Sequence, residues 1–332
     1  MSSNETKKTK LPDILHATQA AESLIRPHIR ETPLEYSPFL SSLSGCRIYL
    51  KLENIQITGS FKLRGALNKI LSLSDQQKKQ GIITASSGNH GAALAYILNK
   101  FKLEGTIYLP ENASSSKIDL LHQYGSDIRQ YGDDCVLAEL QARKIAEEKG
   151  LTYVSPYNDI KIIGGQGTIG IELARQLKEI DMVLCPVGGG GLISGVGGYL
   201  KNKDPEIKII GCQPENSAVM YESIQAGRIL DMPSLPTISD GTAGGIEQGS
   251  ITFDLCKKFV DEFILVSEEE IEKAIKIIVD KHSLLIEGGA ALPVAAFLKN
   301  LSRFKRKNII LILSGSRISS LKLAEIICRR EN

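Results

Sequence analysis

The chain has 332 residues, of which 42% are hydrophobic and 23% are charged, and this composition indicates a globular protein long enough for two lobes. Forty basic and thirty-eight acidic side chains leave a net charge of +2, so no electrostatic footprint for nucleic acid is expected. The six cysteines form no Cys-x-x-Cys pair and have no histidine at ligand spacing, which argues against a zinc site or a disulfide framework. A small-molecule partner is therefore favoured.

Residues 1–10 are polar and carry lysines without an apolar core, so they predict a disordered arm rather than a signal peptide. No later segment has a continuous apolar run of spanning length, so no membrane helix is expected. The default location is the cytoplasm.

The first half of the chain alternates between helical and strand patterns. Asp13 can cap a helix over residues 14–25, and residues 47–52 alternate like a half-buried strand. Ser60 is expected to cap the helix that begins at Phe61. The units that follow are predicted as strands over 81–85, 106–109 and 127–130 and as helices over 92–99, 116–124 and 133–148.

After a change of pattern around residues 153–156, a glycine-containing segment over 160–177 leads into the apolar strand 182–187. Further strands at 207–212, 262–266 and 308–313 alternate with helices, one of which opens with the capping box Ser267–Glu270. This alternation predicts two α/β lobes with mostly parallel sheets, right-handed crossovers and a cleft between the lobes. Ligands collect outside the carboxyl ends of such strands, where both Gly188–Gly191 and Ser86–Gly91 fall.

Gly188–Gly191 is the first candidate binding element. A tight strand-to-helix turn would need only one or two glycines, whereas four let successive backbone N–H groups approach an anion such as phosphate. Leu192 and Ile193 follow in place of the lysine and hydroxyl of a nucleotide P-loop, so a nucleotide triphosphate is not indicated.

Ser86–His90 is the second candidate. Its hydroxyls, amide and N–H groups at a helix start suit a carboxylate, although a loop capped by Ser87 or Asn89 would have the same residues. No Gly-x-Ser-x-Gly elbow surrounds the serines, so a Ser-His-Asp hydrolase is disfavoured. We interpret His90 as a packed or hydrogen-bonded side chain rather than a base.

Lys62, in the turn Gly59–Gly65, is the third candidate. A lone lysine is usually a surface residue, but one in a dry site has a lowered pKa and a free amine that makes an imine with an aldehyde. Together with a phosphate-binding glycine turn, it indicates pyridoxal phosphate as cofactor.

Five motifs in this order resemble the serine/threonine dehydratase and serine racemase family, and the resemblance runs from about Thr32 to near the C-terminus. The motifs are Lys51–Glu53, Thr58–Ala66, Ser86–Gly91, Gly188–Leu192 and Ser239–Gly241. The family has the tryptophan-synthase-β-like fold, with its active site in the interdomain cleft. By this resemblance we expect a large domain over 1–56 and 157–332 and a small domain over 57–156.

The resemblance implies that Lys62 forms the internal Schiff base and later moves the α-proton, while Ser87, on the opposite face of the ring, can reprotonate the α-carbon. Phe61 would pack on the ring, Asn89 would bond its hydroxyl, and the substrate carboxylate would lie at the serine turn. The cofactor-binding set is Phe61, Lys62, Asn89, Gly188, Gly189, Gly190, Gly191, Leu192, Gly241, Glu287 and Ser314. The substrate-binding set is Ser86, Ser87, Gly88, Asn89 and His90.

Ser314 would place a neutral hydroxyl on the pyridine nitrogen. A carboxylate there would keep the nitrogen protonated, whereas a hydroxyl does so far less, which suits expulsion of a β-hydroxyl as the α-proton leaves. The alternatives are that Ser314 only caps a strand end and that Asp240 or Glu287 is a salt-bridged structural carboxylate.

Three features depart from relatives. The usual Gly-Gly-Asn after the serine is here Gly315-Ser316-Arg317, and an arginine at this place would fit an acidic substrate. Gln213 and Val219 match metal-binding acidic residues of animal serine racemases, so no metal is expected. The chain ends soon after the last helix, without the length for a regulatory domain.

The expected reaction is β-elimination of L-threonine or L-serine to 2-oxobutanoate or pyruvate and ammonia, in a homodimer. The alternatives are a racemase, a dehydratase of another β-hydroxy amino acid such as phenylserine, hydroxyaspartate or a hydroxyectoine-derived diaminobutyrate, and a catalytically silent cofactor-binding protein.

Overall fold

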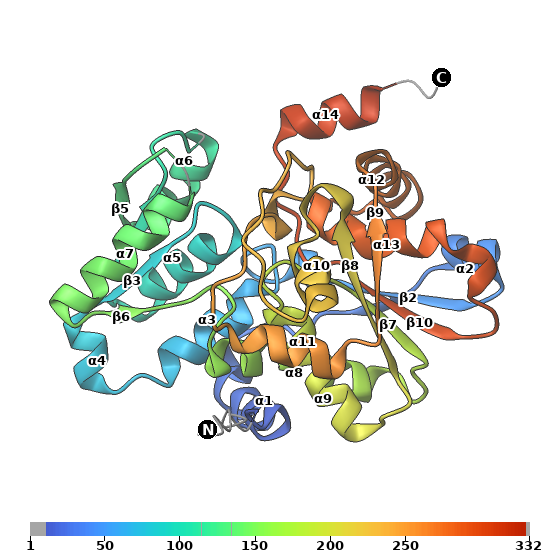
Figure 1. Cartoon of the computed structure of the whole chain (residues 1–332), viewed down its shortest axis with the longest axis horizontal. Coiled ribbons are helices and arrows are strands. Elements are labelled where there is room, and N and C mark those ends of the chain that lie inside the picture. The colour runs from blue at the N-terminus through green and yellow to red at the C-terminus, as the bar shows by residue number, and fades with distance from the viewer. Residues whose placement is uncertain (1–10, 114, 134, 330–332) are drawn as a thin grey trace, which may run out of the picture.

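The computed structural model describes residues 11–113, 115–133 and 135–329, which form two separate sheets (Figure 1). The larger sheet has six strands in the order β1-β2-β10-β7-β8-β9. They are β1 (Leu34–Tyr36), β2 (Arg47–Lys51), β7 (Met182–Pro186), β8 (Lys208–Pro214), β9 (Glu262–Val266) and β10 (Asn308–Ile312). Every pairing in it is parallel except that of β1 with β2.

The smaller sheet has four parallel strands in the order β5-β4-β3-β6. They are β3 (Ile82–Ala85), β4 (Gly105–Leu109), β5 (Asp127–Gln130) and β6 (Thr152–Tyr153). This sheet lies on the left of Figure 1 and the six-stranded sheet on the right. The prediction of an α/β chain with two mostly parallel sheets is confirmed.

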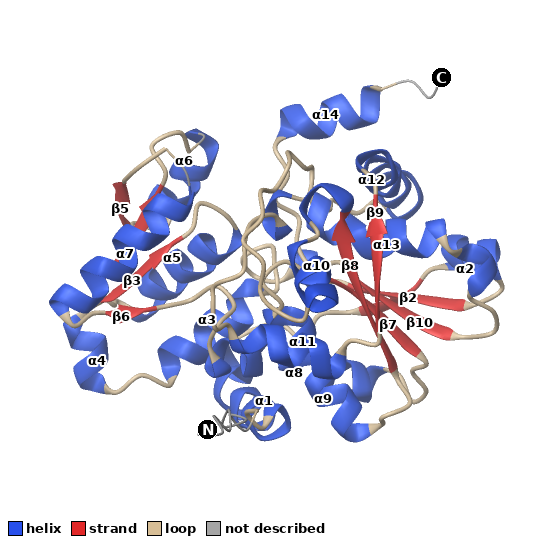
Figure 2. Ribbon diagram, in the orientation of Figure 1, coloured by secondary structure: helices blue, strands red, loops and turns tan. Residues whose placement is uncertain are grey.

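Helices cover both sheets (Figure 2). Those of the first half are α1 (Ile14–Ile25), α2 (Pro38–Ser44), α3 (Lys62–Leu71), α4 (Asp75–Gln80), α5 (Asn89–Phe101), α6 (Ser115–Gln123) and α7 (Cys135–Lys149). Those of the second half are α8 (Ile160–Gln176), α9 (Gly191–Lys203), α10 (Val219–Ala226), α11 (Ile251–Phe259), α12 (Glu268–His282), α13 (Gly288–Lys299) and α14 (Ser320–Cys328). None of the helices in the described part of the chain is long and apolar enough to cross a membrane.

The central strands bury both of their faces, as expected for a parallel sheet. Leu184 and Leu311 pack with apolar residues of α12 and α13, whereas Val183 and Ile310 pack with those of α8 and α9. In the smaller sheet, Ile83 contacts the alanines of α7, and Ile107 packs with α5 and α6. Successive side chains of a strand point to opposite faces, so each strand contributes to two cores.

Several local predictions hold and others need correction. Asp13 accepts a hydrogen bond from the backbone N–H of His16, and the capping box at Ser267 is formed, as predicted. The sequence predicts neither β1 nor β6, and it starts α5 three residues too late. The segment over 160–177 is a helix, and its Gly165 lets α8 touch α3, because a Cβ there would lie 2.6 Å from the Arg64 carbonyl oxygen.

The prediction that Ser60 caps the lysine-bearing helix is wrong. Helix α3 begins at Lys62 with Phe61 at the N-cap position and without a side-chain cap. Ser60 instead forms an isolated antiparallel bridge with Gly315, and the Phe61 N–H donates to the Ser314 carbonyl oxygen. This tie to the end of β10 fixes the entry to α3, so a hydroxyl cap is not needed. The domain boundaries near residues 56 and 156 stay a prediction.

Candidate active site

Lys62 is the first residue of α3 and is partly buried. Its Nζ donates a hydrogen bond to the Pro156 carbonyl oxygen at 2.9 Å and lies 5.3 Å from the centre of the Phe61 ring. Burial lowers the pKa of Lys62 to about 8, against the opposing charge of Glu287. The amine is therefore far closer to its neutral, nucleophilic form at pH 7 than an ordinary lysine is.

Asn89 and Glu287 are in direct contact, although 198 positions separate them in the sequence. The Asn89 Nδ2 donates to both carboxylate oxygens of Glu287, at 2.8 and 2.9 Å, and the Arg317 N–H donates to Oε2 at 3.0 Å. Burial raises the pKa of Glu287 to about 7. Both hydrogen-bond donors are uncharged groups, so the alternative of a salt-bridged structural carboxylate does not describe Glu287.

The amide of Asn89 has one side still available. Its Oδ1 is buried and has no hydrogen-bond partner among the described residues. A buried polar atom without a partner costs free energy, so a ligand group or a water molecule is expected to bond it. Asn89 is also the first residue of α5, and its N-cap Gly88 provides no side-chain cap. The alternative of a loop capped by Asn89 or Ser87 is therefore not observed.

The glycine turn Gly188–Gly191 connects β7 to α9. Gly190 is in the left-handed region with φ +83°, and a Cβ on Gly189 would lie 2.4 Å from the Tyr157 ring, so neither position suits a larger residue. The turn has no side-chain cap at the start of α9. The first N–H groups of this helix therefore need an acceptor, and an anion suits that position.

Three other residues predicted from sequence, His90, Ser86 and Leu192, have contacts within the protein. His90 is buried, its Nε2 donates to the Val154 carbonyl oxygen at 3.1 Å, and burial and then the Lys62 charge lower its pKa to about 3. It is thus a neutral, hydrogen-bonded side chain, in agreement with the interpretation from sequence. Ser86 Oγ accepts from the Gly88 N–H at 3.3 Å, and Leu192 is packed in the apolar core.

Gly241 and the turn that contains Ser314 and Gly315 both lie near Glu287. A Cβ on Gly241 would lie 3.5 Å from Glu287 Oε1, and one on Gly188 would lie 3.0 Å from the neighbouring Thr242 backbone. Ser314 is buried at the end of β10, beside Gly315, where a Cβ would be 2.6 Å from Glu287. The arginine of this turn points its guanidinium to the Thr58 carbonyl oxygen at 2.8 Å. An acidic substrate for this arginine remains a hypothesis.

Tyr157 and the Pro156 carbonyl group were missed by the sequence reasoning. The first lies against the glycine turn and the second holds Lys62. The change of pattern around residues 153–156 was the available signal, because Pro156 and Tyr157 lie a few residues beyond the carboxyl end of β6, where ligands collect.

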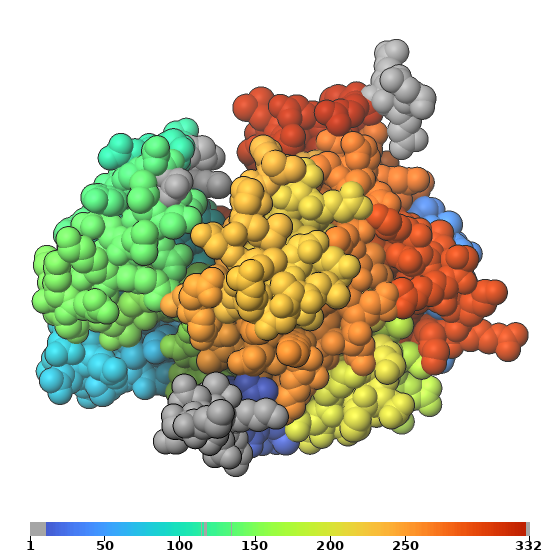
Figure 3. Space-filling model, viewed as in Figure 1, coloured from blue at the N-terminus to red at the C-terminus, as the bar shows by residue number. Residues whose placement is uncertain are grey.

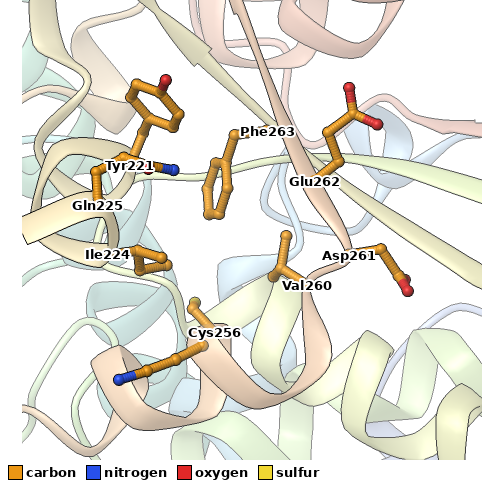
Figure 4. A pocket seen from close by; sticks show the side chains of 9 residues that line it. Tyr221, Ile224, Gln225, Cys256, Val260, Asp261, Glu262 and Phe263 are labelled. Atoms are coloured by element: carbon orange, nitrogen blue, oxygen red, sulfur yellow. The ribbon is translucent and has the colours of Figure 1, made fainter. Parts of the chain in front are cut away.

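Two places away from Lys62 were compared with this site, the region of Gln213 and Val219 and a cavity beside α10. Gln213 Oε1 accepts from the Tyr221 N–H at 2.9 Å and Val219 is buried, and no cluster of acidic, histidine or cysteine side chains among the described residues is arranged to hold a metal ion. A cavity of about 350 Å³ between α10, α11 and β9 (Figure 4) is lined by none of the predicted site residues. Its lining includes the buried Cys256, whose Sγ would lie 2.9 Å from a Cβ on Gly190.

Comparison with known proteins gives a consistent picture. The family model of the pyridoxal-phosphate dependent enzymes matches residues 25–315. The chain belongs to this family. It is 40% identical over 313 residues to the L-threonine ammonia-lyase of Thermotoga maritima, which covers 94% of this chain and 78% of that protein.

Solved structures agree in fold. The processed threonine deaminase isoform 2 of Solanum lycopersicum has a TM-score of 0.89 and 35% identity and covers 94% of this chain and 87% of that one. Maize serine racemase has a TM-score of 0.89 and 32% identity and covers 94% and 95% of the two chains. Both support the fold predicted from the resemblance.

The residues present fit pyridoxal phosphate, the cofactor of the family. Lys62 offers an amine of lowered pKa, the glycine turn offers uncapped N–H groups, and Asn89 offers a buried oxygen without a partner in the described chain. These three features match the aldehyde, phosphate and ring-polar groups of the cofactor.

The lowered pKa of Lys62 predicts how the cofactor-free protein captures pyridoxal phosphate. Amines attack aldehydes as free bases, and with a pKa of about 8 half of Lys62 is neutral at pH 8, against about 0.3% of an ordinary lysine. The attachment rate, followed by absorbance between pH 6 and 11, should rise with pH and level off just above pH 8. A rate that still rises tenfold per unit at pH 9 would contradict the lowered pKa.

Proposed function

We propose that this enzyme is an L-threonine and L-serine ammonia-lyase, which converts these substrates to 2-oxobutanoate or pyruvate and ammonia. The observation that carries the proposal is that Lys62 lies near both the Asn89–Glu287 pair and the glycine turn. The Glu287 charge acts on its Nζ, and its partner Pro156 precedes Tyr157, which lies against the glycine turn. The relatives named threonine ammonia-lyase and threonine deaminase support the reaction class.

Pyridoxal phosphate, when bound, supplies an aldehyde carbon for amines and a conjugated ring that takes up electron density from the α-carbon. Lys62 would hold the cofactor through its Nζ, and the same amine, once free, would remove the α-proton of the substrate. The glycine turn would hold the phosphate, and Asn89, oriented by Glu287, would bond the ring oxygen. Ser86 and Ser87 with their backbone N–H groups would bind the substrate carboxylate, and Phe61 would pack on the ring.

The proposed reaction of threonine has two stages, an elimination and a hydrolysis. The α C–H and β C–O bonds of threonine break, one molecule of water leaves, and an enamine is released. The enamine tautomerises to an imine, and one water molecule hydrolyses this to 2-oxobutanoate and ammonia. Ser314 would offer the pyridine nitrogen a neutral hydroxyl rather than a carboxylate, so the ring would take up less electron density, which would suit loss of the β-hydroxyl as the α-proton leaves.

The test is 2-oxoacid release by the purified, cofactor-loaded protein with L-threonine and L-serine supplied separately. Prompt formation of 2-oxobutanoate or pyruvate is expected, and their ratio ranks the two substrates. If neither appears while the absorption of the lysine-bound cofactor is intact, threonine and serine are the wrong substrates. The phenylserine, hydroxyaspartate and diaminobutyrate alternatives are then supplied in the same assay.

Racemisation is the second candidate, favoured by Ser87 and by the likeness to maize serine racemase. It requires an acid on the face of the ring opposite Lys62, and Ser87 follows β3 at the turn into α5. With L-serine as substrate, Ser87→Ala should lower D-serine formation about 100-fold and pyruvate formation less than tenfold, because only racemisation needs the second proton carrier. Chiral chromatography measures both products. Equal losses would leave Ser87 a role only in binding the carboxylate.

A homodimer and a cytoplasmic location are part of this proposal. Sedimentation of the purified protein tests the first, and fractionation of the source cells tests the second.

A further inference from the structure

The segment Ser155–Asn158 contacts both halves of the proposed cofactor site. Its Pro156 carbonyl oxygen accepts the hydrogen bond from Lys62 Nζ. Its Tyr157 lies against the glycine turn, so closely that a Cβ on Gly191 would be 3.1 Å from the Tyr157 Cα and one on Gly189 would meet the ring. Any shift of this segment therefore moves a partner of the lysine and a wall of the glycine turn together.

The segment has little regular structure of its own. It follows the two-residue strand β6 and precedes α8. Ser155 Oγ accepts from the N–H groups of Tyr157 and Asn158, at 3.4 and 3.0 Å, which folds it into a turn. Turns of this kind are held mainly by the groups around them.

Glu247, in the loop before α11, supplies such groups at two points. Its Oε2 accepts from Asn158 Nδ2 at 2.8 Å, and its backbone N–H donates to the Tyr157 hydroxyl at 2.8 Å. Asn158 Oδ1 in turn accepts from the Ile251 N–H at 3.0 Å, at the start of α11. One side chain–side chain bond and two side chain–backbone bonds thus join the loop before α11 to the segment Ser155–Asn158.

Glu247 also connects the segment to the smaller sheet. Its Oε2 accepts from the Arg143 guanidinium of α7 at 3.0 Å, and the same guanidinium lies 4.3 Å from the centre of the Tyr153 ring. Helix α7 packs on the smaller sheet through its alanines. In Figure 3 the green surface of this half meets the orange surface of the segment before α11.

We propose that Glu247 is a positioning residue that holds Ser155–Asn158 against Lys62 and the glycine turn, and that its pair with Arg143 ties this position to α7. The inference rests on the proposed role of the lysine and the glycine turn as the cofactor site. The carboxylate binds neither substrate nor cofactor itself. It acts through Asn158, while the backbone N–H of Glu247 holds the Tyr157 hydroxyl.

The first test uses the cofactor-free protein, so it does not depend on the reaction. In Glu247→Ala, hydrogen–deuterium exchange of the peptide over residues 155–158 should be about tenfold faster than in the parent, because a hydrogen bond to a charged group is lost. Exchange in β7 should be unchanged. The second test is the Kd for pyridoxal 5'-phosphate, which should rise about tenfold for the same reason.

Two further variants separate positioning from simple loss of an ion pair. Glu139→Ala removes the other carboxylate bound to Arg143, at 2.8 Å, and leaves the contacts of Glu247 in place, so its exchange and Kd should match the parent. Glu247→Gln keeps an acceptor for Asn158 and should recover most of both effects. Equal behaviour of Glu247→Ala and Glu139→Ala, or a rise in exchange throughout the chain, would overturn the proposal. Because neither readout needs turnover, failure of the ammonia-lyase assay leaves both interpretable.

Discussion

Replacing Lys62 with alanine is expected to abolish the absorption of the lysine-bound cofactor and to lower kcat by roughly 10⁴-fold or more. Two roles are lost together, because the same Nζ attaches the cofactor and carries the α-proton, and proton transfer alone contributes about 10² to 10⁴. The protein should still fold, since Lys62 stands at the first position of α3, and within the described residues its Nζ has one hydrogen bond, to the Pro156 carbonyl oxygen, and the ring contact with Phe61.

The matched control is Lys69→Ala, in the same helix. Lys69 forms an ion pair with Asp159 at 2.6 Å and lies two turns away from the lysine of the site. Its loss should leave the absorption and kcat within about twofold of the parent, because surface ion pairs contribute little. Spectra and 2-oxoacid assays of both variants decide the matter. Unchanged absorption and turnover in Lys62→Ala would show that another lysine carries the cofactor.

The candidate site residues could be proposed from sequence because each lies in a short motif with its own local chemistry. Lys62 and the glycine turn lie close to where a helix begins, and the local pattern predicts a helix near each of them. Asn89 lies in the motif Ser86–Gly91, although the sequence places the start of its helix three residues too late. The pairing of Asn89 with Glu287 could not be predicted, because it depends on how α5 and α13 meet across 198 positions.

The wrong and the missing assignments also concern features that contacts between distant parts of the chain determine. Ser60 has the residue type of a helix cap, but the backbone tie to Gly315 gives it an extended conformation. The segment over 160–177 is rich in glycine, which lowers its helix propensity, yet tertiary contacts with α1, α3 and α9 form the helix. Glu247 and Arg143 lie in none of the motifs. The contacts that join Arg143 to Glu247 and Glu247 to Tyr157 form only when the chain folds.

A group of buried charges surrounds Arg64, two residues after Lys62, and we expect it to affect the stability of the fold. The Arg64 guanidinium, fully buried, donates to both oxygens of Glu53 at 2.8 and 2.7 Å and to both oxygens of Glu172 at 2.7 and 2.9 Å. Lys51 Nζ contacts Glu172 at 2.6 Å and the Thr32 carbonyl oxygen at 2.7 Å. Arg26, which is partly exposed, also contacts Glu172, at 2.8 Å. Three cations thus surround two buried carboxylates in a group that joins β2, α3 and α8.

Arg64→Ala should lower the free energy of unfolding by about 3–5 kcal/mol, because two buried carboxylates lose the guanidinium that bonds all four of their oxygens. Urea denaturation of the cofactor-free protein measures this. The control is Arg303→Ala, which removes an ion pair with Glu262 at the surface and should cost less than about 1 kcal/mol. A loss below 1 kcal/mol for Arg64→Ala would show that water enters the site and solvates the carboxylates.

The same charges give the protein a defined sensitivity to acid. Burial alone would raise the pKa of Glu172, but the charges and hydrogen bonds of Arg64 and then Lys51 lower it from 4.5 to about 2. A carboxylate with a depressed pKa contributes stability that is complete above its unfolded value, and this contribution is lost as the pH falls from 4.5 towards 2. Glu172→Gln should therefore flatten the acid limb of the stability curve between these values, while Arg303→Ala keeps it.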